Sequence, residues 1–395
     1  MINKNVETFI GIVKAGLCGK GVSIPNDFEM DKLYILAKKH RIMGLIFNGA
    51  KVSGANEELD VMKKLYRGAV AELTFHEKQM SCLEPLFQSF KENKISFMPL
   101  KGTTLKLLYP RPELRSMGDA DILIKTEEYP RIKKVLEDLS FEFQSQSSNE
   151  IVWEKGNSLH LELHSALFPS YTEEFLSVFG DGWTKAVLDG GEYRYKMAPE
   201  DEFVYNFTHF TKHYKLGGIG VKHLCDLWLL SKNPCLDFAK VDREIEALDL
   251  TEFYQNIRKT LSFWFEGGKA DPKVELITKT IIKSGAFGTK QSSQNAFVLR
   301  LAAENGSNGE KKRHLVWMFK IFPAAKFIEH KYTFLKKQPW LLPLAWALRW
   351  FDAIFLHRGK IKTGVKAIKN TSDETSLRIE KEFLEVGLKF NHTEE

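Results

Sequence analysis

Cysteine is scarce in this chain of 395 residues, which has only Cys18, Cys82, Cys225 and Cys235. No two of them are spaced as a CxxC pair or as the ligands of a zinc finger. This usage argues against a disulfide-rich secreted scaffold and is typical of reduced thiols in a cytoplasmic protein. The N-terminal stretch MINKNVETFIGIVKAGLC contains Glu7 and no small-residue cleavage pattern, so we expect no secretory signal peptide.

Long apolar runs are missing as well. No stretch reaches the roughly 18 to 20 uncharged residues of a membrane-spanning helix, so we expect no transmembrane segment. The nearest is WLLPLAWALRWFDAIFL, residues 340–356, which is interrupted by Pro343, Arg349 and Asp352. We interpret it as a buried helix of a helical subdomain, with a helix lying on a membrane surface as the alternative.

The charge of the chain is unevenly distributed. The formal net charge is +6, yet residues 310–369 contain 14 lysines and arginines against three acidic residues. Aromatic residues are interleaved with these basic ones, which favours an anionic partner such as a membrane surface or RNA. A solvated basic surface without a partner is the alternative, and no known RNA-binding motif is present. We therefore expect a cytoplasmic protein, with peripheral membrane attachment as an option.

Hydrophobic spacing divides the chain into four regions. Residues 1–93 have the helical period, 94–198 combine short apolar segments with helices, 199–304 are helical again, and 305–395 form a basic, aromatic, helical segment. The predicted strands are ISFMPLKG, DADILI, FEFQ, IVWEK and LHLELH. This order predicts an α+β protein, in which a mixed sheet core lies between a helical N-terminal region and a helical C-terminal domain.

Two aspartates begin one of the predicted strands. In RSMGDADILI, residues 115–124, Asp119 and Asp121 are two positions apart and therefore share one face of the strand. Carboxylates held so close repel each other unless a cation lies between them, and Mg²⁺ prefers such oxygen ligands. In the alternative interpretation, one aspartate caps a turn and the other pairs with Arg115 or with a lysine.

A further acid lies on a later strand. In LHLELH, residues 159–164, His160, Glu162 and His164 share one face. If this strand lies beside the first, Glu162 joins Asp119 and Asp121 in a cluster able to hold two metal ions about 3.5–4 Å apart, as phosphoryl transfer requires. Alternatively, the two histidines and Glu162 bind zinc in a hydrolase.

A glycine turn lies upstream of both strands. Gly102 stands where a strand passes into a helix, between Lys101 and Thr103, and free backbone N–H groups at such a turn favour phosphate. Arg115 is a candidate for neutralising phosphate charge, and a plain salt bridge to an acid explains it equally well.

These three elements together resemble the nucleotidyltransferase superfamily. LKGTTLKLLYP, LRSMGDADILI and LHLELH follow one another as a glycine turn that opens a helix, an Asp-x-Asp strand and a later acidic strand. More narrowly, they are similar to a family of uncharacterised bacterial nucleotidyltransferases that carry a lysine before the glycine. THFTKH, VKHLCDLWLL and GAFG look like the helical C-terminal half of that family, so the resemblance covers most of the chain.

The resemblance implies a site and a reaction. Asp119, Asp121 and Glu162 would be the catalytic carboxylates and the ligands of two Mg²⁺ ions. Lys101, Gly102, Thr103 and Arg115 would bind a nucleoside triphosphate (NTP). The residues expected on the acceptor side of the cleft are His164, His209, His213, Lys222 and Asp226. The reaction would transfer a nucleoside monophosphate to an acceptor hydroxyl or similar group and release pyrophosphate.

One departure from the superfamily pattern concerns the turn. The superfamily usually has Gly-Ser or Gly-Gly there, whereas this chain has Lys101, Gly102 and Thr103. The lysine would offset triphosphate charge. A non-catalytic binding or scaffold protein that keeps the fold is the alternative to an enzyme, and nothing in the sequence specifies the acceptor or the base of the nucleotide.

Overall fold

The computed structural model describes residues 2–147, 149–168, 173–286, 321–328, 332–356 and 373–389. Contacts divide the chain into two compact units. The first comprises Met1–Thr211 and Ile219–Ala286, and the second Lys212–Gly218 and Phe287–Glu395. Ten of the 14 lysines and arginines in the basic segment 310–369 lie outside the described residues, so its proposed anionic partner stays a prediction. No helix in the described part of the chain is both long and apolar enough to cross a membrane.

The first unit begins with a helical region, as predicted. Its helices are α1 (Lys4–Cys18), α2 (Met30–His40), α3 (Met43–Val52) and α4 (Asp60–Glu92). Helices α1 and α3 can pack closely because glycines lie between them: a Cβ on Gly49 would come 2.0 Å from the carbonyl oxygen of Ile12. Any larger residue there would force the two helices apart.

A five-stranded mixed sheet follows, which confirms the predicted α+β fold. Its strands are β1 (Phe97–Leu100), β2 (Ala120–Ile124), β3 (Glu142–Gln146), β4 (Glu150–Lys155) and β5 (Leu159–His164). They lie in the order β1-β2-β5-β4-β3; β2 and β5 are parallel and the other neighbours antiparallel. The parallel pair places two strands from different parts of the sequence at the centre of the sheet.

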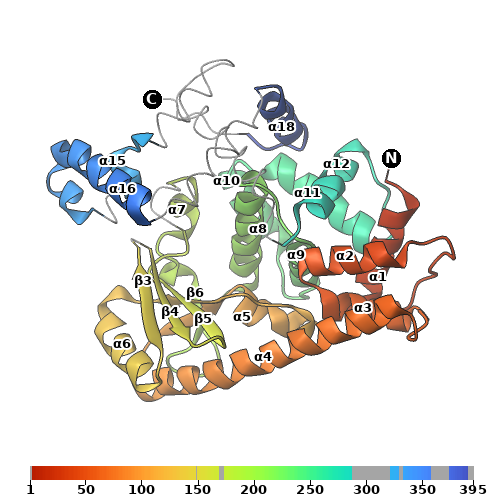
Figure 1. Cartoon of the computed structure of the whole chain (residues 1–395), viewed down its shortest axis with the longest axis horizontal. Coiled ribbons are helices and arrows are strands. Elements are labelled where there is room, and N and C mark those ends of the chain that lie inside the picture. Colours follow the sequence, from red (N-terminus) through yellow and green to blue (C-terminus); the bar gives the residue numbers. More distant parts are fainter. Residues whose placement is uncertain are drawn as a thin grey trace. The chain divides into compact units, whose positions relative to one another are not determined.

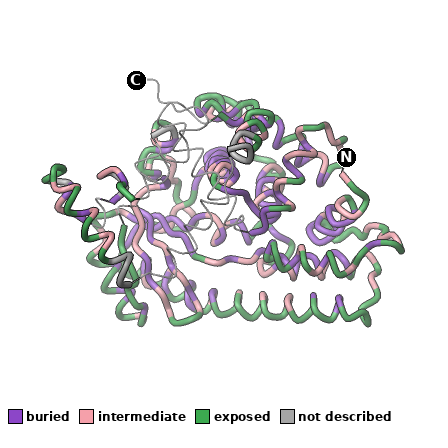
Figure 2. Tube along the Cα trace, turned by 45° about the horizontal axis from the view of Figure 1, so that its top comes forward, coloured by how far each residue is buried: buried purple, intermediate pink, exposed green. Residues whose placement is uncertain are grey.

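The two faces of the sheet differ in character. Ile122, Leu161 and Leu163 are buried together with Leu86 and Phe90 of α4. Helix α4 runs along this side of the sheet together with α6 (Tyr129–Asp138) (Figure 1). Strands β1 and β2 are buried along their whole length, whereas β3 and long stretches of α4 are exposed (Figure 2). Because side chains alternate along a strand, the polar residues between these apolar ones project from the opposite face.

The connection between β1 and β2 is less helical than the sequence predicts. It contains α5 (Gly102–Leu105) and the 3₁₀ turns η1 (Lys106–Leu108) and η2 (Pro112–Leu114). The sequence TTLKLLY predicts one helix over residues 103–109, but the helix does not continue to Tyr109, whose backbone is extended at φ −78° and ψ 155°. Pro110 follows Tyr109, and a proline disfavours the helical conformation of the residue before it.

Helices return after the sheet. They are α7 (Glu173–Phe179), α8 (Pro199–Lys215), α9 (Val221–Ser231), α10 (Phe238–Ala247), α11 (Thr251–Phe265) and α12 (Pro272–Ser284), with the small hairpin of β6 (Ala186–Leu188) and β7 (Tyr195–Met197) before α8. The first turn of α8 contains Glu200, Asp201 and Glu202, whose negative charges stabilise a helix N-terminus. From Lys212 on, α8 belongs to the second unit.

The second unit is helical where it is described. It contains α15 (Ala325–Ile328), α16 (Leu342–Leu356) and α18 (Asp373–Glu385). Helix α16 forms in the apolar stretch 340–356, and its Trp346 and Trp350 donate hydrogen bonds to carbonyl oxygens of residues 323 and 321 at 2.8 Å each. The sequence predicts a buried helix here, but only one face of α16 is buried: Ala345 is buried, whereas Leu344 and Leu348 are 49% and 43% exposed.

Candidate functional site

The register of the parallel strands brings two of the expected carboxylates together. Asp121 on β2 lies directly opposite Glu162 on β5. Paired residues project from the same face, so both carboxylates stand on the side of the sheet that faces away from α4. Asp119 lies in the loop, one residue before β2 begins. The sequence could not reveal this register, because β2 and β5 are far apart along the chain.

Three side chains have the arrangement of a metal site. Among the described residues, Asp121, Glu162 and His164 each offer a ligand atom, and these atoms lie within 4.8 Å of one another. Asp119 is outside this group, and its residue is open to solvent. Enough protein surrounds its carboxylate, however, that desolvation raises its pKa, and the negative charges of Asp121 and Glu162 add to the effect. The three carboxylates therefore act on one another electrostatically.

Asp121 is held in place by two donors. The Lys101 ammonium donates a hydrogen bond to Oδ1 at 2.6 Å, and Nε2 of His164 lies 2.8 Å from the same oxygen. Burial alone would raise the pKa of Asp121, but the charge of Lys101 and the hydrogen bond from His164 outweigh it and lower the pKa. The Oδ2 atom accepts no hydrogen bond from any residue that the structure describes. Asp121 is thus ionised, oriented and left with one oxygen for a ligand.

Lys101 has an unusual backbone conformation. Its φ is 48° and its ψ is −120°, a region that residues other than glycine rarely adopt. Such a conformation costs on the order of 1–3 kcal/mol. Burial would lower the pKa of Lys101, but the charge of Asp121 outweighs burial and raises it, so the ammonium stays protonated. The strained residue therefore presents a fixed positive charge to the carboxylates.

His160 lies apart from His164. Its Nδ1 is 3.1 Å from Glu154 Oε1 and its Nε2 is 3.4 Å from Glu162 Oε1. Burial lowers the pKa of His160, but the hydrogen bond to Glu154 and the charge of Glu162 outweigh it and raise the pKa. His160 lies outside the group of described side chains whose ligand atoms are within 4.8 Å of one another, whereas His164 and Glu162 belong to it. The two histidines of the zinc hypothesis are thus not brought into one group, and the hydrolase alternative stays a prediction.

The glycine turn is packed tightly against the loop that leads to Asp119. A Cβ on Gly102 would lie 2.7 Å from Nη1 of Arg115 and 2.8 Å from Cγ of Met117. The hydroxyl of Thr103 lies 3.7 Å from the sulfur of Met117. Because α5 has only four residues, its helix dipole is short. The assignment of phosphate binding to Gly102 and Thr103 stays a prediction.

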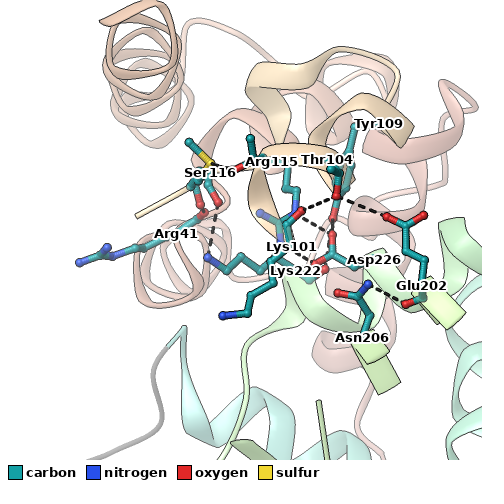
Figure 3. Close-up of polar contacts among 12 residues, drawn as sticks. Arg41, Lys101, Thr104, Tyr109, Arg115, Ser116, Glu202, Asn206, Lys222 and Asp226 are labelled. Atoms are coloured by element: carbon teal, nitrogen blue, oxygen red, sulfur yellow. Dashed lines mark hydrogen bonds and ion pairs between the residues drawn. The ribbon is translucent and has the colours of Figure 1, made fainter. Parts of the chain in front are cut away.

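Arg115 is part of a buried polar network (Figure 3). Its Nε and Nη2 donate to Oδ1 and Oδ2 of Asp226 on α9, both at 2.8 Å, and the side chains are 4% and 3% exposed. The hydroxyl of Tyr109 donates to the same carboxylate at 2.9 Å. Burial would lower the pKa of Arg115, but Asp226 outweighs it and raises the pKa. Of the two roles that the sequence allows for Arg115, the structure displays the salt bridge.

Lys222 joins this network from α9. Its ammonium lies 3.4 Å from the carbonyl oxygen of Ser116 (Figure 3). Burial and the nearby charge of Arg115 lower its pKa to about 8. Lys222 and Asp226, both expected on the acceptor side, thus anchor the loop that carries Asp119. Their contact with an acceptor remains a prediction.

A comparison with known families agrees with this arrangement. The family model described as an uncharacterised nucleotidyltransferase matches residues 26–266. The chain belongs to this family. The match includes the glycine turn, both acidic strands and α9, and it ends at residue 266, directly after α11. No curated protein and no solved structure matches the chain.

The helix after the nucleotidyltransferase sheet adds a residue that the sequence did not indicate. Tyr205 of α8 is 2% exposed. Burial raises its pKa to about 12, an effect that Lys101 opposes and that Asp121 and Glu162 support. The phenol is therefore close to the catalytic candidates. Its position four residues before His209 could have revealed Tyr205 from the sequence, because residues four apart share one face of a helix.

His209, Glu202 and His213 also lie on α8. The ring of His209 is 6.4 Å from that of Tyr205. Glu202 accepts a hydrogen bond from Thr104 at 3.3 Å, and burial raises its pKa (Figure 3). His213 lies in the part of α8 that belongs to the second unit.

Proposed function

We propose that this member of the family is an active, magnesium-dependent nucleotidyltransferase. It would transfer a nucleoside monophosphate from an NTP to an acceptor hydroxyl or similar group, with release of pyrophosphate. The observation that carries the proposal is the direct pairing of Asp121 and Glu162 across the parallel strands. This pairing gives the family's core two neighbouring carboxylates on strands β2 and β5.

The donor set suits a magnesium ion. In the group of possible ligands, Asp121 and Glu162 offer carboxylate oxygens and His164 offers a ring nitrogen, which already lies 2.8 Å from Asp121 Oδ1. Asp119, in the neighbouring loop, interacts electrostatically with both carboxylates and would add a third oxygen. Mg²⁺ prefers oxygen ligands and is commonly held by one or two carboxylates together with substrate phosphates. When bound, the ion would neutralise charge on the triphosphate and polarise the phosphoryl group that is attacked.

The protein's own residues prepare this site. Lys101 and His164 fix the orientation of Asp121 and keep it ionised through the bonds to Oδ1. Arg115 supports the turn at Gly102 from behind, where its guanidinium lies against the glycine. Such prior positioning of charged groups is the main source of rate acceleration in phosphoryl transfer.

A non-catalytic member of the same fold is the second candidate. The close Lys101–Asp121 ion pair favours it, because an ammonium group already compensates one of the expected metal ligands. In that case the protein would bind a partner and release no pyrophosphate.

Pyrophosphate release separates the two functions. The full chain would be incubated with Mg²⁺ and each labelled NTP in turn, in the presence of cell extract as a source of acceptor. We expect Asp121→Asn to reduce release by about 100-fold or more, because it weakens charge stabilisation of the transition state. Asp138→Asn is the control, since Asp138 is exposed on α6 in the same core. Release that is equal in wild type and Asp121→Asn would contradict the proposal.

A further inference from the structure

The charges of the side chains around Asp121 bear on how many metal ions the site can hold. The sequence predicts two ions from three carboxylates, because Asp119, Asp121 and Glu162 carry three negative charges between them. The structure adds one permanent positive charge, since the Lys101 ammonium lies 2.6 Å from Asp121 Oδ1. Apart from His164, whose Nε2 also lies against Asp121 Oδ1, these four groups together carry two negative charges, which a single divalent ion neutralises.

The contacts of Asp121 also favour a single metal ion. A carboxylate that bridges two metal ions commonly gives one oxygen to each. Oδ1 of Asp121 already accepts the bond from Lys101 and faces Nε2 of His164. Only Oδ2 is without a hydrogen bond from the described residues. Asp121 therefore has one oxygen to offer to one ion.

The position of Lys101 is built into the backbone. Its positive φ of 48° directs the chain sharply between β1 and α5, and its carbonyl oxygen accepts hydrogen bonds from the backbone N–H groups of Thr104 and Leu105 at 3.1 and 2.8 Å. An ammonium fixed in this way repels a second cation that approaches the same carboxylate.

We propose that this nucleotidyltransferase holds one divalent ion, and that the Lys101 ammonium supplies at Asp121 the positive charge that a second ion supplies in two-ion sites. The ion itself is held from the side of Asp121 Oδ2, Glu162 and Asp119. The inference rests on the proposed function, because it assumes that these carboxylates bind a metal. It changes the role of Lys101 from a phosphate ligand to a fixed counter-ion of a catalytic carboxylate.

The metal stoichiometry tests this inference without any measurement of activity. The metal-free full chain would be titrated with Mn²⁺ alone, and bound ions would be counted by calorimetry and by electron paramagnetic resonance. Ions at the site are those lost in Asp121→Asn. We expect one such ion in wild type. Lys101→Met removes the fixed charge and should either admit a second ion or tighten the first by about tenfold, as expected when a nearby like charge is removed.

Two further variants make the test specific. Lys101→Arg keeps the charge and should leave the stoichiometry at one. Lys106→Met removes another lysine of the same segment, which is 1% exposed and pairs with His76 instead of a carboxylate, and it should also leave the stoichiometry at one.

The outcomes distinguish this inference from the proposed function. Two Asp121-dependent ions in wild type would overturn the single-ion site and leave the transferase intact. One ion in both wild type and a folded Lys101→Met, with equal affinity, would also overturn it. If no Asp121-dependent ion binds at all, the metal site and the proposed function both fail. A count of two in wild type overturns the inference even if Lys101→Met does not fold.

Discussion

Removing the Arg115 guanidinium should cost the protein a large part of its stability. Arg115 and Asp226 form a bidentate pair with both bonds at 2.8 Å, and the side chains are 4% and 3% exposed. Arg115→Met would leave the Asp226 carboxylate buried with only the Tyr109 hydroxyl as a hydrogen-bonding partner among the contacts described here. Breaking a buried pair in this way costs about 3–5 kcal/mol. We expect the free energy of unfolding to fall by that amount.

Urea denaturation of the full chain, followed by tryptophan fluorescence, measures this loss. Lys133→Met is the control, because Lys133 pairs with Glu137 on the surface of α6 and the two side chains are 53% and 55% exposed. Such exposed pairs contribute less than about 1 kcal/mol. The double variant Arg115→Met with Asp226→Leu should recover at least half of the loss, because it no longer buries an unpaired charge.

One result would refute this reasoning. If Arg115→Met cost less than about 1 kcal/mol, as an exposed pair would, and instead weakened NTP binding, then Arg115 would serve the substrate. The phosphate role implied by the family resemblance would then replace the structural one.

Three further variants test the packing and the charges of the first unit. His40 is buried, accepts from the Val221 N–H at Nδ1, and has its pKa lowered to about 4 by burial. The His40 imidazole takes up a proton near pH 6.5 in the unfolded chain but not in the folded one. Between pH 7 and pH 5 the free energy of unfolding of wild type should therefore fall by about 2 kcal/mol, a loss that His40→Gln avoids. If urea denaturation gave the same loss between the two pH values for wild type and His40→Gln, this reasoning would be contradicted. Gly102→Ala should lower stability by about 1–3 kcal/mol through its clash with the pinned Arg115, whereas Gly191→Ala, which has open space around it, should change the thermal midpoint little. Leu161→Ala should cost about 2–5 kcal/mol in urea unfolding because Leu161 is fully buried, and a smaller loss would place it outside the core.

Local sequence was sufficient for much of the fold. The apolar segments around Asp121 and Glu162 form β2 and β5 where alternation predicted strands, and the helical spacing before residue 93 yields α1 to α4. These features are local, because the spacing of apolar side chains among neighbouring residues indicates whether a segment forms a helix or a strand. The helix after Gly102 is shorter than its apolar spacing predicts: it passes into a 3₁₀ turn at Lys106, and Tyr109 is extended before Pro110.

The sequence alone thus determined which residue types were present to form a site: an acid pair, a later acid, a glycine turn and a lysine. Only the tertiary structure decided their partners. It set Asp121 opposite Glu162, placed the Lys101 ammonium on Asp121, and buried Arg115 against Asp226, 111 residues away. These pairings depend on strand register and on contacts between distant segments, and a single sequence contains no local pattern that reports on either.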